Sequence, residues 1–264
     1  MYAFTFHQPT TVRQAANLLA KHKEAKLLAG GHSLIPVMKQ RLASPAAIVD
    51  LSKVEGMSGV ELKGRSLVIG AMTRHADVAN STVAQQALPG LAAVPGSIGD
   101  PQVRNMGTIG GSIANNDPNA DYPAACLGLG ATIITNKRRI ASDDFFTGMF
   151  STALEDDEII TKVSFPIAKK AAYEKFKHPA SGFALVGVFV SKRGADIRVA
   201  VTGAGANGVF RVKSFEEALK KRFAAKSIEG MSIPVAGMNS DIHAGAEYRA
   251  HLVGVLARRA LAKA

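Results

Sequence analysis

Two glycine pairs in the first half of the chain constrain the fold most strongly. Gly30-Gly31 precede His32-Ser33, and Gly110-Gly111 lie between Thr108 and Ser112. Neighbouring glycines reach left-handed backbone angles and lack Cβ atoms, so a bulky group can approach the main chain closely. One such pair usually marks only a turn, but two pairs flanked by hydroxyl groups match the two phosphates of a pyrophosphate. We therefore predict a dinucleotide site between two lobes of one domain.

A third glycine motif, Gly203-Ala-Gly205-Ala-Asn-Gly208, fits the G-x-G-x-x-G pattern of dinucleotide-binding folds. That fingerprint requires a helix to open within the motif, whereas residues 209–212 have the pattern of a strand. We predict a hairpin connection here and no nucleotide site. The chain also lacks G-x-x-x-x-G-K-[ST], which excludes a P-loop.

The hydrophobic periodicity predicts an α+β protein with two domains, residues 1–168 and 169–264. The first domain has lobes of about residues 1–55 and 56–168. Its helices are expected after residue 11 and at residues 34–41, 74–80, 82–93 and 120–130. Its strands are expected near residues 26–29, 48–51, 58–72, 131–136 and 159–165. The second domain is expected to contain strands at residues 173–178, 183–192 and 196–204, followed by helices at residues 213–225 and 246–262.

Composition excludes several classes of protein. Cys126 is the one cysteine, so this chain alone forms no disulfide, iron–sulfur cluster or cysteine-rich zinc site. Tryptophan is absent and aromatic residues make up 6% of the chain, which argues against a platform for stacking bases or sugars. No apolar run reaches the ~18 residues of a membrane span, and the first residues do not resemble a signal peptide. We therefore expect a cytoplasmic protein.

The net charge of +11 is concentrated in the last third of the sequence. Residues 1–165 contain 15 Lys and Arg against 14 Asp and Glu, whereas residues 166–264 contain 17 against 7. Such charge has two interpretations: it belongs to solvated helix faces, or it forms a surface that binds an acidic partner. No nucleic-acid recognition motif accompanies it, so we predict no nucleic-acid binding.

Longer stretches around the glycine pairs carry a resemblance to one family. Residues 29–38 with 41–43, and residues 100–104 with 106–111, resemble the two flavin loops of the FAD-binding medium subunits of aerobic carbon monoxide dehydrogenase and of xanthine dehydrogenase-type molybdenum hydroxylases. Residues 115–124, 173–177, 247–249 and 252–259 are also similar. The resemblance implies a bilobed flavin-binding domain of the vanillyl-alcohol-oxidase (PCMH) type. It also implies a small C-terminal domain with a three-stranded antiparallel sheet and helices.

The resemblance assigns residues to non-covalently bound FAD, and it assigns no catalytic residue and no metal ligand. Those around the pyrophosphate are Ala29, Gly30, Gly31, His32, Ser33, Leu34, Thr108, Ile109, Gly110, Gly111 and Ser112. Ile98 and Ile160 match nucleotide contacts, Asp121 matches an acidic residue at the polar middle of the cofactor, and Lys177 and Phe183 match positions near the flavin. Lys177 has a second interpretation as a solvated strand residue, and Phe183 as a core aromatic. Two departures are Ser112, where relatives often have Asn, and the absence of an Asp from residues 180–183.

The function that the resemblance implies is electron transfer without substrate chemistry. In the family a large molybdopterin subunit oxidises the substrate, and a small subunit passes electrons through two [2Fe-2S] clusters to the flavin subunit, which delivers them to an external acceptor. The medium chain of carbon monoxide dehydrogenase is the first candidate, within a dimer of heterotrimers. The alternative is a self-sufficient FAD-dependent oxidoreductase of the same wider fold, with His32 as the site of covalent attachment. We interpret His75 as a residue that caps or packs a helix start.

Overall fold

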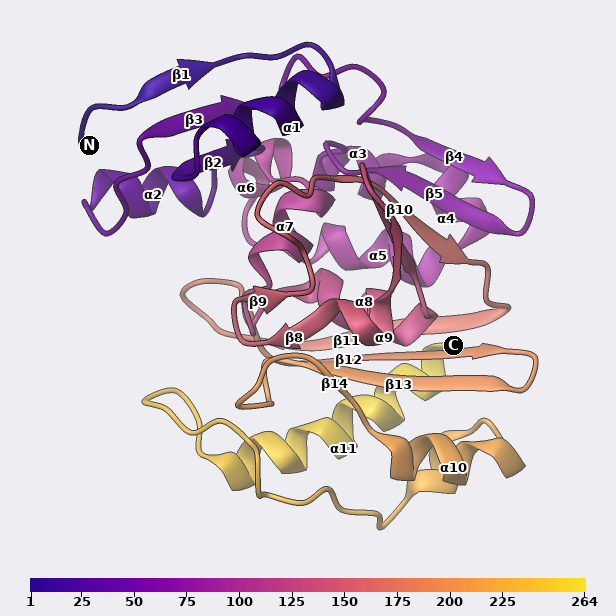
Figure 1. Cartoon of the computed structure of the whole chain (residues 1–264). Helices are drawn as coiled ribbons and strands as arrows, with labels where there is room; N and C mark the ends of the chain where they lie inside the picture. The colour runs from indigo at the N-terminus through magenta and orange to yellow at the C-terminus, as the bar shows by residue number, and fades with distance from the viewer.

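The computed structural model describes residues 1–264 and has three main sheets, of which the first two lie above the third in the view of Figure 1. The first sheet is parallel and consists of β1 (Thr5–His7), β3 (Ala47–Asp50) and β2 (Ala25–Leu28), with β3 in the centre. Its connecting helices are α1 (Val12–Lys21) and α2 (Leu34–Lys39). The predicted start of α1 is confirmed, because Thr11 and Gln14 form a reciprocal capping box.

The second sheet is antiparallel and has the order β4-β5-β10-β6-β7. Its strands are β4 (Val60–Lys63), β5 (Ser66–Gly70), β10 (Ile160–Pro166), β6 (Thr132–Thr135) and β7 (Arg139–Ala141). Between β5 and β6 lie α3 (His75–Asn80), α4 (Thr82–Ala87), α5 (Pro89–Gly96), α6 (Pro101–Met106), α7 (Ile109–Asn115) and α8 (Asp121–Leu129). The short elements α9 (Ser142–Phe145), β8 (Phe146–Gly148) and β9 (Ser151–Thr152) precede β10. The single helix predicted for residues 82–93 is wrong, because Pro89 lacks an N–H group and starts a new helix.

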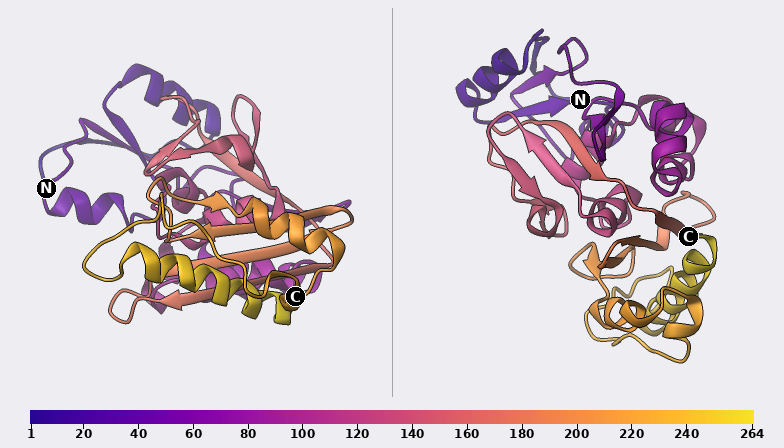
Figure 2. Two further views of the ribbon diagram at one scale, coloured as in Figure 1. Left: turned by 90° about the horizontal axis from the view of Figure 1, so that it is seen from below. Right: turned by 90° about the vertical axis from the view of Figure 1, so that its right-hand side faces the viewer.

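The third sheet is antiparallel and contains β11 (Lys170–Lys177), β12 (Ala184–Arg193), β13 (Asp196–Thr202) and β14 (Phe210–Arg211) in chain order. The predicted three-stranded sheet is therefore wrong by one short strand. The predicted hairpin after the G-x-G-x-x-G motif is confirmed, because β14 pairs with β13. The chain continues through α10 (Lys213–Lys221), a 3-10 turn (Ala225–Ile228) and α11 (Ala246–Lys263). These helices cover the face of the sheet that points away from the N-terminal sheets (Figure 2).

Two hydrophobic cores lie on opposite faces of the third sheet. One cluster of 32 buried residues joins both N-terminal sheets and includes Phe189 of β12, and a cluster of 21 lies between the third sheet and the C-terminal helices. Side chains alternate along a strand, so Val188 and Val190 face the second core. Gly128 of α8 makes room for Phe189, since a Cβ atom there would lie 2.6 Å from the ring. The domain boundary at residue 168 stays a prediction, and none of the helices could span a membrane.

Candidate functional site

The structure brings the segments around the two glycine pairs into contact. A Cβ atom on Gly30 would lie 2.2 Å from the carbonyl oxygen of Met106 and 2.7 Å from the Cα atom of Gly107. A Cβ atom on Gly111 would lie 3.6 Å from the Cβ atom of Ala29. The first loop can therefore pass the second only because residue 30 has no side chain. Two segments almost eighty residues apart in sequence form one surface.

The first loop, residues 29–34, presents free backbone donors. None of the N–H groups from Gly30 to Leu34 donates to an acceptor in the chain. Gly31 has a φ of 74°, a backbone conformation that favours glycine. Ser33 precedes α2 without forming a side-chain cap, so its exposed hydroxyl also stays free, and His32 is exposed beside it. Unpaired N–H groups need an acceptor, and a phosphate oxygen supplies one.

The second predicted glycine loop, residues 108–112, is in the structure the N-cap and first turn of α7. We keep the name second loop for it, and it already uses its N–H groups inside the protein. Ile109 N donates to Thr73 O at 3.2 Å and Gly110 N to Ala71 O at 2.8 Å. Gly111 N donates to Thr108 Oγ1 at 3.1 Å, and Ser112 N donates to Thr108 O at 3.0 Å. This loop therefore offers a hydroxyl and the open face of Gly111 rather than an array of amides. Gly110 is buried, and its missing side chain makes room for Ala71.

Asp121 lies at the first turn of α8 and joins it to the third sheet. Its side chain is 3% exposed, accepts a hydrogen bond from the Tyr173 hydroxyl at 2.6 Å and forms an ion pair with Lys175 Nζ at 2.9 Å. Lys175 Nζ also donates to Ser97 O at 3.0 Å. Burial raises the pKa of Asp121, while Lys175 and Tyr173 oppose that shift. Burial likewise lowers the pKa of Lys175, against the attraction of Asp121.

This pairing was missed by the sequence reasoning, although the sequence carries a signal for it. Tyr173, Lys175 and Lys177 alternate along β11 and so share one face of the strand. Two of them contact Asp121, and the charge of Lys177 also acts on that carboxylate. Asp121 thus holds the third sheet against α8. Any contact of Asp121 with the cofactor would have to be made while the carboxylate is bound to Tyr173 and Lys175.

Three further predicted residues, Ile98, Lys177 and Phe183, lie in or beside the loop that joins β11 to β12. The loop that joins β11 to β12 contains Gly182, with a φ of 70°, whose Cβ atom would lie 3.4 Å from Gly99 Cα. Phe183 follows and is 48% exposed, which makes its interpretation as a core aromatic wrong. Lys177 precedes the same loop and is exposed. Ile98 is half-buried beside Gly99, and its carbonyl accepts a hydrogen bond from Arg104 Nη1 at 2.9 Å.

Two predicted residues point away from this surface. Ile109 and Ile160 belong to the first hydrophobic core and are 0% and 6% exposed. Their side chains therefore have no access to a ligand, and only their backbone atoms are candidates for contact. Their apolar character serves packing.

His75 lies behind the second loop. As interpreted from the sequence, it packs at a helix start, where it is the first residue of α3 and is 5% exposed. A Cβ atom on Gly107 would lie 2.7 Å from His75 Nε2, and the ring lies 5.4 Å from the Tyr122 ring and is tilted by 42° to it. Burial, with a smaller contribution from His32, lowers the pKa of His75 to about 4. The imidazole is therefore neutral at neutral pH, and its buried Nδ1 has no hydrogen-bond partner.

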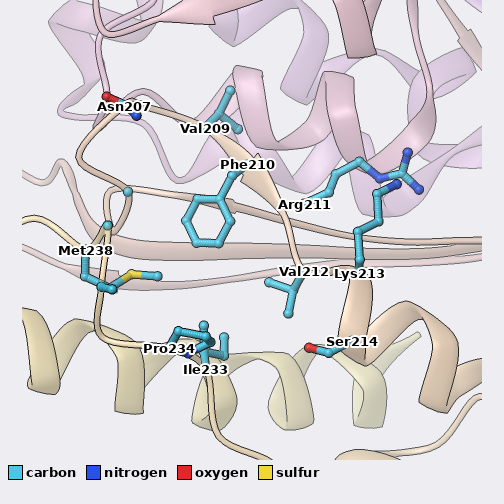
Figure 3. Close-up of a pocket in the computed structure, with 14 residues that line it drawn as sticks. Asn207, Val209, Phe210, Arg211, Val212, Lys213, Ser214, Ile233, Pro234 and Met238 are labelled. Carbon is cyan, nitrogen blue, oxygen red and sulfur yellow. The ribbon is translucent and has the colours of Figure 1, made fainter.

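The G-x-G-x-x-G motif lies elsewhere, in the wall of a cavity of about 350 Å³ in the C-terminal part (Figure 3). Phe210, Ile233 and Met238 form apolar walls, and none of the predicted cofactor residues reaches this cavity. Gly205 is required for packing, since a Cβ atom would lie 2.5 Å from Gly208 O. No group of three or more His, Cys, Asp or Glu side chains is arranged to hold a metal ion.

Comparison with known families identifies the chain. Residues 2–168 match the family described as the FAD binding domain in molybdopterin dehydrogenase. The chain belongs to this family. The predicted family and its cofactor, FAD, are thereby confirmed, and the free amides of the first loop fit a pyrophosphate.

Curated relatives match this family member along almost its whole length. It is 34% identical to the carbon monoxide dehydrogenase medium chain of Hydrogenophaga pseudoflava, over 98% of this chain and 96% of the relative. It is 35% identical to the nicotine 6-hydroxylase medium subunit of Paenarthrobacter nicotinovorans, over 99% and 97%. The solved carbon monoxide dehydrogenase of H. pseudoflava superposes with a TM-score of 0.87, at 34% identity, over 99% of this chain and 96% of that one.

Proposed function

We propose that this protein is the FAD-carrying electron-transfer subunit of a molybdenum hydroxylase complex. It receives electrons from [2Fe-2S] clusters in a small subunit and passes them to an external acceptor. The observation that carries the proposal is the match of nearly the whole chain to medium subunits of dehydrogenases and hydroxylases. The medium chain of carbon monoxide dehydrogenase is the first candidate.

The relatives' names support a role that does not depend on the substrate. Medium chains or subunits of similar sequence belong to a carbon monoxide dehydrogenase, a nicotine 6-hydroxylase and a glyceraldehyde dehydrogenase. These substrates share no common recognition chemistry, so a shared chain is best explained by a step that all the complexes have in common. We infer that substrate oxidation takes place in a partner subunit.

We propose that residues 29–34 bind the pyrophosphate through their free amides, with Ser33 and Ser112 as hydroxyl donors. Thr108 orders the second loop by capping α7, and Gly111 leaves space beside the first loop. Lys177 and Phe183 lie near the flavin and Ile98 contacts the nucleotide, with Ile160 and Ile109 limited to backbone contact. FAD supplies the redox chemistry when bound, since it exchanges electrons singly or in pairs. The protein binds and orients it, and Asp121 with Lys175 holds the two parts of the site together.

Electron delivery requires a second polypeptide. Cys126 is fully buried and is the one cysteine, so this chain supplies no set of thiolates for a cluster. We propose that the partner docks near Lys177. The basic residues of the last third do not all lie near Lys177, because Lys170 begins β11 and Lys177 ends it, and eight residues of strand span about 23 Å. The dimer of heterotrimers, the PCMH-type designation of the bilobed fold and the cytoplasmic location stay proposals.

The test is expression of this chain alone and beside its candidate partners. The isolated chain is expected to bind one FAD, to release all of it on denaturation, and to oxidise no organic substrate. Affinity purification from its native source is expected to yield an iron–sulfur subunit and a molybdopterin subunit in equal amounts, and mass photometry then measures the assembly. Turnover of an organic substrate by the isolated chain at ~1 per second or faster would establish the alternative, a self-sufficient oxidoreductase. Flavin retained after denaturation would indicate covalent attachment, with His32 as the candidate residue.

A further inference from the structure

We propose that His178 and His243 position the rim loop, residues 178–183, through a hydrogen bond between their two imidazoles. We call this pair the histidine clasp. The inference rests on the proposed function, because the rim loop carries Phe183 next to the proposed flavin position.

His178 organises the rim loop through both its backbone and its side chain. His178 N donates to Phe183 O at 2.8 Å, and Gly182 N donates to His178 O at 2.9 Å. Its Nδ1 accepts from the N–H groups of Ala180 and Ser181, each at 3.3 Å. Ser181 Oγ lies 3.2 Å from His178 Nδ1 and accepts a hydrogen bond from Phe183 N at 3.3 Å, so the imidazole ring is linked to Phe183 through this hydroxyl.

These contacts determine where the protons of the clasp lie. Because His178 Nδ1 accepts from N–H groups, the proton of the neutral ring is on Nε2. His178 Nε2 lies 3.1 Å from His243 Nδ1, with the two rings 4.4 Å apart. His243 Nδ1 is therefore the acceptor. Asp241 fixes the His243 backbone by accepting from His243 N at 2.8 Å, and Arg249 pairs with the other Asp241 oxygen at 2.7 Å.

The experiment measures FAD release from the full-length chain by the rise in flavin fluorescence at pH 8. Loss of one hydrogen bond predicts that His243→Ala releases FAD about two- to tenfold faster at pH 8. His243→Asn carries an acceptor atom where Nδ1 lies and is expected to restore the wild-type rate at pH 8. His251→Ala, an exposed residue on α11, is the matched control and is expected to behave as wild type.

A wild-type release rate for His243→Ala at pH 8 would overturn the proposal. A second measurement needs no cofactor: nitrogen NMR of the imidazoles in the FAD-free chain is expected to find His178 protonated at Nε2 and unprotonated at Nδ1. The opposite tautomer would also overturn it. Failure of wild type to bind FAD would instead contradict the proposed function, and the NMR result would still decide the clasp.

Discussion

The two glycine loops have nearly the same composition, yet they use their hydrogen-bonding groups in opposite ways. The first loop leaves the amides of residues 30–34 without an acceptor, whereas residues 109–112 of the second donate to Ala71, Thr73 and Thr108. One loop therefore offers donors for a ligand, and the other is part of the scaffold against which that ligand is held. A Gly-Gly pair by itself does not distinguish these roles.

This difference leads to a general expectation for the site. Groups whose hydrogen bonds are used inside the protein should affect stability when they are changed, whether or not FAD is present. Groups that are left free should affect FAD affinity and leave stability nearly unchanged. Four predictions test this division, from the largest expected effect to the smallest.

Asp121→Ala should have the largest effect, because it leaves the buried ammonium of Lys175 without a counter-charge. Removing one partner of a buried ion pair costs about 3–5 kcal/mol. Urea unfolding of the FAD-free protein measures it, with the exposed Asp144→Ala as control. An Asp121→Ala protein of wild-type stability that binds FAD weakly would assign this carboxylate to the cofactor instead.

His75 behind the second loop should make stability depend on pH. Its pKa is about 4 in the folded protein and about 6.5 when unfolded, so the unfolded chain binds the proton first as pH falls. The stabilisation is complete above pH 6.5 and is lost between pH 6.5 and 4, which amounts to about 2–3 kcal/mol between pH 7 and 4.5. Denaturation curves of wild type and His75→Gln at both pH values measure the contribution of His75 to the pH dependence of the free energy of unfolding. Parallel pH profiles of the two proteins would contradict the prediction, and His251→Gln should match wild type.

Gly110→Ala and Gly111→Ala separate the two roles within one loop. A methyl group on Gly110 would lie 2.7 Å from Ala71 O, so the free energy of unfolding should fall by about 1–3 kcal/mol. A methyl group on Gly111 would meet Thr108 Oγ1 at 3.0 Å and face the first loop. It should cost less than about 1 kcal/mol in stability but weaken FAD about tenfold. Thermal unfolding measures the stability of each variant, and fluorescence titration measures its FAD affinity. Equal changes in both quantities for the two variants would contradict the assignment of different roles to Gly110 and Gly111.

Ser33→Ala should have the smallest effect and act on affinity alone. Its hydroxyl is exposed and caps nothing, so loss of about 1 kcal/mol of hydrogen bonding to phosphate weakens FAD about fivefold. The melting temperature of the FAD-free protein should not change. Titration with FAD measures the affinity, and the exposed Ser58→Ala is the control. An unchanged FAD affinity would remove Ser33 from the proposed site.

Much of the local structure was predictable, because its causes are local. Thr11 and Gln14 cap a helix through groups three residues apart, and the glycine motif before residue 209 leads into a strand because no helix opens within it. The break at Pro89 was also readable, and its neglect made one predicted helix out of two. The fourth strand of the third sheet was missed, because a two-residue strand carries too little periodicity to be recognised without its partner.

The sequence by itself determined the family, the cofactor class and the two segments that would form the site. Glycine pairs, hydroxyls and strand periodicity act within a few residues of themselves. Only the tertiary structure decided which of those groups remain free for a ligand. Gly110 and Ile109 are committed to packing, Asp121 is paired with Lys175 from 54 residues away, and His178 meets His243 across 65 residues. Whether a donor is free depends on every acceptor that folding brings near it. Contacts between segments far apart in the sequence decide which acceptors those are.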